Sequence, residues 1–101
     1  MGNAFVVQYE TSSEKADENQ RLVEAVFAEL AAKAPAGLSY ASFRLADGVS
    51  FVHVGRYEGE GDSPLPALDA FKEFAAGMAD RAPAGARPSG ATLIGEYGFG
   101  D

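Results

Sequence analysis

The chain has 101 residues, about the length of one domain, and its composition of 47% hydrophobic and 23% charged residues is ordinary for a globular protein. It contains no cysteine, which excludes disulfides, thiolate nucleophiles and cysteine-ligated metal sites. A formal net charge of −7 disfavours a phosphate backbone as partner, and no apolar run is long enough to span a bilayer. We therefore expect a single cytoplasmic domain over residues 1–101, without nucleic-acid or membrane partners.

The first part of the chain predicts a strand followed by an amphipathic helix. Residues 4–9 are rich in β-branched and aromatic side chains, as strands are. From Asp17 onward, apolar residues recur at three- and four-residue intervals, which predicts a helix that Pro35 ends. Asp17 and Gln20 have the spacing of a capping box, while a second such pair beginning at Thr11 offers an alternative start.

The middle of the chain predicts a β-hairpin. Two extended runs, residues 38–45 and 49–57, meet at Asp47-Gly48, a strong signal for a tight turn. A two-residue turn pairs Phe43 with Val52. A three-residue turn with a bulge would shift the first strand by one residue and exchange the faces of its side chains.

The second half predicts another helix and a last strand. Ser63-Pro64 can cap and begin a helix, which Pro66 makes irregular at its start and which stops by Pro83. Residues 83–90 are rich in proline and glycine and predict a loop, and residues 91–99 predict the final strand.

This β-α-β-β-α-β order predicts an α+β, ferredoxin-like fold. Right-handed crossovers and the hairpin favour a four-stranded antiparallel sheet in the order 4-1-3-2, with two helices on one face. With the two-residue turn, one side of the hairpin is plainly apolar, and we expect that side to face the helices. The opposite side then carries Tyr40, Ser42, Arg44, Phe51, His53 and Tyr57. Because the first and the last strand are apolar on both sides, we expect the uncovered face to pack against a second copy in a homodimer.

Three segments resemble a known family: residues 37–40 (Gly-Leu-Ser-Tyr), 47–54 (Asp-Gly-Val-Ser-Phe-Val-His-Val) and 64–71 (Pro-Leu-Pro-Ala-Leu-Asp-Ala-Phe). They are similar to small proteins of the dimeric α/β-barrel superfamily, of the antibiotic biosynthesis monooxygenase type. The resemblance implies dimerisation through the sheet and a small-molecule pocket between sheet and helices. It also implies an oxygenase without metal or flavin, acting on an aromatic substrate whose deprotonated form passes an electron to oxygen. Gly55 stands where many members of that family carry glutamate.

His53, the one histidine of the chain, is the candidate catalytic residue. Imidazole titrates near neutral pH, so His53 could act as general base toward a phenol or quinol. The predicted substrate-binding residues are Tyr40, Arg44, Phe51 and Tyr57, and no metal or other cofactor is predicted. The competing interpretation makes His53 a structural residue of a non-catalytic dimer that binds a small aromatic or hydrophobic ligand. Asn19, at the start of the first helix, could face the pocket, but we expect it to face solvent.

Overall fold

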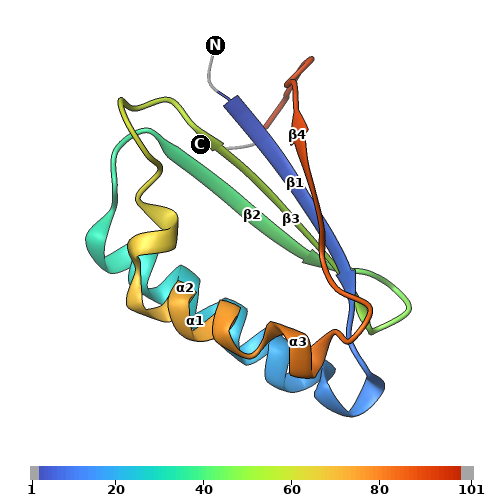
Figure 1. Cartoon of the computed structure of the whole chain (residues 1–101). Helices are drawn as coiled ribbons and strands as arrows, with labels where there is room; N and C mark the ends of the chain where they lie inside the picture. The colour runs from blue at the N-terminus through green and yellow to red at the C-terminus, as the bar shows by residue number, and fades with distance from the viewer. Residues whose placement is uncertain (1–2, 99–101) are drawn as a thin grey trace.

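The computed structural model describes residues 3–98 and has the predicted order of strands and helices. Its main elements are β1 (Asn3–Glu10), α1 (Ala16–Lys33), β2 (Leu38–Arg44), β3 (Ser50–Tyr57), α2 (Asp69–Ala76), α3 (Met78–Arg81) and β4 (Arg87–Ala91). Short 3-10 helices precede α1 at Ser13–Lys15 and α2 at Leu65–Ala67. Over the described residues the strands form one antiparallel sheet in the order β2-β3-β1-β4, and the helices lie against one of its faces (Figure 1). The predicted α+β fold and strand order are confirmed.

The hairpin between β2 and β3 has the register of a two-residue turn, with Phe43 opposite Val52. The Asp47 carboxylate fixes this turn by accepting the backbone N–H groups of Val49 at 2.9 Å and Ser50 at 2.8 Å. Gly48 has φ +80°, a left-handed conformation that glycine adopts without steric cost. The turn therefore sets which side chains of the hairpin share a face.

The face that meets the helices is the opposite of the one predicted. The ring of Tyr40 stacks on Phe27 of α1, and the ring of His53 packs against Phe74 of α2. The apolar side of the hairpin is the uncovered one, where Phe43 and Val54 remain 37% and 41% exposed. The prediction was wrong because hydroxyl and imidazole groups can be buried when they hydrogen-bond one another, as Tyr40, Ser42 and His53 do here.

The first helix ends on a left-handed residue rather than on a glycine. Ala34, just after α1, has φ 45°, and its N–H donates to the Leu30 carbonyl at 2.7 Å, which closes the last turn. At the other end, the N-cap positions are occupied by Ser12 and Lys15, and not by the predicted Thr11 and Asp17, and neither makes a side-chain capping bond. Neither predicted capping box therefore forms.

The last strand lies earlier in the chain than predicted. β4 covers Arg87–Ala91 and pairs with β1, where Pro88 stands opposite Val7. Proline is tolerated here because β4 is an edge strand and one side of its backbone needs no hydrogen-bond partner. The segment 92–98 has no strand structure, and within it Ile94 and Tyr97 are almost fully exposed. Phe99, part of the predicted strand, lies outside the described residues.

Gly55 of β3 gives room to a neighbouring aromatic ring. A β-carbon at this position would overlap the ring of Phe5 and would lie 3.1 Å from the ring of Tyr40. Phe5 thus occupies the space that a side chain at position 55 would need.

Within residues 3–98, no helix combines the length and the apolar composition that a membrane crossing requires.

Candidate functional site

A chain of hydrogen bonds centred on His53 lies between the sheet and the helices. On one side of the imidazole, the Tyr9 hydroxyl of β1 is 2.7 Å from Nε2. On the other side, the Ser42 Oγ and the Tyr40 hydroxyl, both of β2, lie 2.6 Å and 2.9 Å from Nδ1. Both ring nitrogens therefore have protein partners, and these partners fix the orientation of the ring.

The chain of hydrogen bonds around His53 continues from Tyr9 to the helices. Asn19 of α1 donates from Nδ2 to the Tyr9 hydroxyl at 2.8 Å, and Arg81 of α3 donates from Nε to Asn19 Oδ1 at 2.8 Å. Arg81 also donates from its Nη2 to the Phe74 carbonyl at 2.6 Å, and its guanidinium lies 5.2 Å from the centre of the Phe74 ring. Asn19 is 0% exposed, so the expectation that it faces solvent was wrong.

Arg81 fits into this site because the second predicted helix is broken. The backbone leaves α-helical geometry at Gly77, which separates α2 from α3. A β-carbon at Gly77 would lie 2.6 Å from Nη1 of Arg81, so the glycine gives the guanidinium its space. Among the residues that the structure describes, no acidic side chain pairs with Arg81. Its buried charge is balanced by carbonyl oxygens and an aromatic face.

Burial shifts the pKa values of the three central groups further from pH 7, and all three are neutral there. It lowers the pKa of His53 from 6.5 to about 4, because the charged imidazolium loses its hydration. It raises the pKa of Tyr9 to about 12, although the hydrogen bond from Asn19 and the charge of Arg81 act in the opposite direction. Burial likewise raises the pKa of Tyr40 to about 12. The site is therefore an uncharged polar chain that ends on the Arg81 cation.

Of the five predicted site residues, the structure brings Tyr40, Phe51 and His53 together. Phe51 is buried and stacks on Tyr9, with the two ring centres 5.5 Å apart. The site therefore includes part of the predicted set, and the roles assigned to these residues stay predictions.

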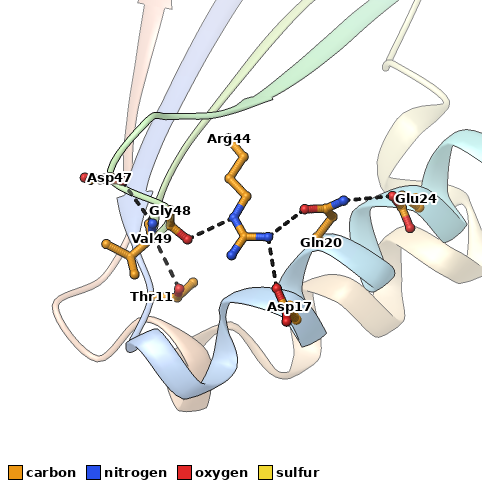
Figure 2. A network of polar contacts seen from close by, with 8 residues as sticks. All are labelled: Thr11, Asp17, Gln20, Glu24, Arg44, Asp47, Gly48 and Val49. Atoms are coloured by element: carbon orange, nitrogen blue, oxygen red, sulfur yellow. Dashed lines mark hydrogen bonds and ion pairs between the residues drawn. The ribbon is translucent and has the colours of Figure 1, made fainter.

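Arg44 lies at the hairpin end of the sheet, where its guanidinium carbon is 5.6 Å from the centre of the Phe51 ring. Its Nη1 donates to Gln20 at 2.7 Å and to Asp17 at 3.1 Å, and its Nε donates to the Gly48 carbonyl at 2.9 Å (Figure 2). These contacts tie the β2–β3 turn to the first turns of α1. Arg44 thus supports the hairpin.

Tyr57 lies with the loop that follows β3. Its hydroxyl is 3.4 Å from the Glu60 carbonyl, and a β-carbon at Gly59 would overlap its ring. Tyr57 therefore packs on the backbone of that loop and not on the chain around His53.

Our prediction did not assign Tyr9, Asn19, Ser42 or Arg81 to the site, and the sequence did contain a signal for two of them, Asn19 and Arg81. Asn19 stands four and seven residues before Val23 and Val26, so it belongs to the buried stripe of α1. Arg81 likewise stands seven residues after Phe74. A polar residue at an apolar position of a helical period indicates one of two things. Either it makes a buried polar contact, or the apolar face of the helix has been assigned wrongly. Here both residues are buried and bonded to each other.

Two hollows border the sheet, one on each face. The smaller, of about 330 Å³, lies between the second half of α1 and the start of β2 and is lined by Phe27, Leu30, Ala31, Ala34, Pro35, Leu38 and Tyr40. The ring of Tyr40 forms part of its wall, while the hydroxyl of the same residue reaches His53. The larger hollow, of about 630 Å³, lies on the uncovered face over Val6, Ala41 and Val54, with residues 91–97 along one side.

Fold and site together define a ferredoxin-like α+β domain with a buried tyrosine–histidine chain and one uncovered sheet face. Solved structures with this fold include a provisionally assigned antibiotic biosynthesis monooxygenase from Nitrosomonas europaea (TM-score 0.76, 15% identity, 98% of this chain and 94% of that one). SnoaB, a cofactor-independent oxygenase from Streptomyces nogalater, is also similar (TM-score 0.70, 14% identity, 96% and 97% covered). So is a Nitrosomonas europaea protein of unknown function (TM-score 0.74, 12% identity, 95% and 92% covered).

These similarities confirm, at the level of fold, the resemblance to antibiotic biosynthesis monooxygenases. At such low identities they establish the architecture, and the activities of those proteins do not transfer with it. No protein-family model matches the sequence, and comparison with curated proteins also gives no match.

Proposed function

We propose that this protein is a homodimer that binds a small aromatic ligand in the hollow between α1 and β2. The observation that carries the proposal is the position of Tyr40, whose ring lines the hollow while its hydroxyl lies 2.9 Å from Nδ1 of His53. The volume of about 330 Å³ is within the range of small-molecule sites, and apart from Tyr40 the lining side chains are hydrocarbon. A planar hydrophobic molecule with one polar edge matches this combination.

The uncovered sheet face supports the dimer. Val6, Ala41 and Val54 stand side by side on β1, β2 and β3, and they form an apolar surface under the larger hollow. Contiguous exposed apolar surface of this kind is uncommon on a monomer, and a domain of this size gains stability from further burial. A second copy presents the same surface, so a two-fold arrangement would cover both faces at once.

Filling the hollow tests the ligand site. We expect Ala31→Phe to weaken binding of 2-naphthol at least about tenfold, because the added ring occupies the space between α1 and Tyr40. Isothermal titration calorimetry measures this change. The matched control is Ala32→Phe, which adds the same ring one residue further along α1, outside the lining. Equal binding by both variants would place the ligand elsewhere.

A more specific activity, cofactor-independent monooxygenation, is the second candidate. It rests on the neutral ring of His53, which has one nitrogen without a proton at pH 7, although a pKa of about 4 makes this nitrogen a weaker base than that of an ordinary histidine. In such a reaction the deprotonated substrate reduces dioxygen. A substrate methylene becomes a carbonyl, one oxygen atom enters the product, and the other leaves as water with the two hydrogens. SnoaB, which shares the fold, is a cofactor-independent oxygenase.

Oxygen uptake with an anthrone as substrate separates this activity from simple binding. If His53 takes part in the reaction, we expect His53→Gln to slow uptake about 100-fold, the lower range for loss of an acid–base group. An oxygen electrode measures the rate, and circular dichroism checks that the variant is folded. Equal rates in parent and variant would remove His53 from the chemistry. No uptake above the uncatalysed rate by the parent would leave the non-catalytic ligand-binding dimer.

A further inference from the structure

We infer that Arg81 and Asn19 are positioning residues that select one tautomer of His53, with the proton on Nδ1 and the lone pair on Nε2. Neutral imidazole has two tautomers, and the one present is set by the groups that each nitrogen meets. The inference goes beyond the proposed function and holds whether or not the protein is an enzyme. It follows from the direction in which each hydrogen bond of the chain can run.

The direction starts at Arg81, because a guanidinium can donate hydrogen bonds and cannot accept them. The atom of Asn19 that lies 2.8 Å from Nε of Arg81 must therefore be the carbonyl oxygen Oδ1. The amide group Nδ2 is then the atom that lies 2.8 Å from the Tyr9 hydroxyl. The orientation of an asparagine amide is assigned from its hydrogen bonds, and here the arginine fixes it.

The second step passes through Tyr9. Its oxygen accepts from Asn19, so its own proton needs an acceptor elsewhere, and Nε2 of His53 lies 2.7 Å away. Among the residues that the structure describes, this nitrogen is the acceptor that the buried hydroxyl can reach. A proton on Nε2 would leave the hydroxyl proton of Tyr9 without a partner, which is costly in a buried site. Nε2 therefore carries the lone pair.

The third step defines what His53 presents to β2. With Nε2 unprotonated, the single proton of the neutral ring is on Nδ1 and points toward Ser42 Oγ at 2.6 Å and the Tyr40 hydroxyl at 2.9 Å. On the side of Tyr40 and the hollow, His53 is thus a hydrogen-bond donor. Any proton that His53 accepts arrives at Nε2, through Tyr9.

Nitrogen-15 NMR at pH 7 tests this assignment directly. The chain has one histidine, so a labelled sample gives a single pair of ring-nitrogen signals. The chemical shifts of protonated and unprotonated ring nitrogens are well separated, and we expect the protonated type for Nδ1 and the unprotonated type for Nε2. The opposite pattern, or an even average of the two, would overturn the inference.

The isosteric variant Asn19→Asp tests whether Asn19 sets the direction. A carboxylate accepts from Arg81 with one oxygen and from the Tyr9 hydroxyl with the other, so Tyr9 must now accept from His53. We expect the proton to move to Nε2, which exchanges the two signal types. Gln20→Glu adds the same charge at the next residue, which takes no part in the hydrogen bonds around His53, and it is expected to leave the signals unchanged. An unchanged tautomer in Asn19→Asp would contradict the role of Asn19.

A second pair of variants tests Arg81 independently of Asn19→Asp. Arg81→Lys retains a group that can donate and cannot accept, and it is expected to keep the proton on Nδ1. Arg81→Met removes the donor and lets the Asn19 amide turn over, so signals of the Nε2–H tautomer should appear. Identical tautomer populations in the two variants would show that Arg81 does not set the direction of the hydrogen bonds from Asn19 to His53.

Discussion

Acidification through the range from pH 6.5 to about 4 is expected to remove about 3 kcal/mol from the free energy of unfolding through His53 alone. The unfolded chain binds a proton at the ordinary histidine pKa of 6.5, whereas the buried ring resists protonation until about pH 4. The contribution of His53 to the free energy of unfolding is therefore fully present above pH 6.5. It is lost as the pH falls from 6.5 to about 4, and below that the loss does not increase further. Burial explains the resistance, because the charged imidazolium would lose its hydration among neutral neighbours such as Tyr9, Tyr40 and Ser42.

Urea unfolding at several pH values, for the parent and His53→Gln, measures this effect. Carboxylates titrate over part of the same range, but they do so in both proteins and cancel in the difference. At neutral pH the variant should be the less stable protein, because glutamine cannot reproduce both contacts of the imidazole. By pH 4 we expect that gap to have changed by about 3 kcal/mol in favour of the variant. Parallel curves would show that the ring is not held neutral.

Val54→Glu is expected to raise the dissociation constant of the proposed dimer about 100-fold or more, which corresponds to about 2.7 kcal/mol. Val54 lies in the middle of the uncovered face, between Val6 of β1 and Ala41 of β2. Two-fold symmetry would bury two unpaired carboxylates near each other, and each loses hydration without gaining a partner. The net charge of −7 per chain adds to the repulsion.

Sedimentation velocity over a range of concentrations measures this change. The matched control is Ala32→Glu, which adds the same carboxylate on the helical side and should leave the dimer intact. A parent protein that remains monomeric at micromolar concentration would contradict the dimer itself. Equal dissociation constants for the two variants would mean that the subunits meet through a different surface.

The parts of the fold that the sequence predicted correctly depend on local or general rules. The Asp47-Gly48 step determines the hairpin register, because the carboxylate and the left-handed glycine act within a few residues. The strand order follows from the handedness of crossovers, which holds for almost all proteins. The grouping of Phe51 with His53 follows from the two-residue period of a strand.

The parts that the sequence did not predict depend on contacts between distant residues. We predicted the wrong face of the sheet for the helices, because Tyr40 and Ser42 have polar side chains and the sequence does not show that His53 is their hydrogen-bond partner. Asn19 and Arg81 are separated by 62 positions, and no spacing rule connects them. The sequence therefore predicted His53 and Tyr40 as site residues and missed the contact between Asn19 and Arg81 that joins α1 to α3.

Gly55 of β3 and the ring of Phe5 on β1 share one volume beside Tyr40. A larger residue at position 55 fits only after residue 5 has become smaller, because the added atoms would otherwise overlap the Phe5 ring. Substitutions at the two positions are therefore expected to be non-additive in the free energy of unfolding, with the double exchange better tolerated than the single change at position 55. The residue that β3 accepts at this position thus depends on the side chain that β1 places opposite it.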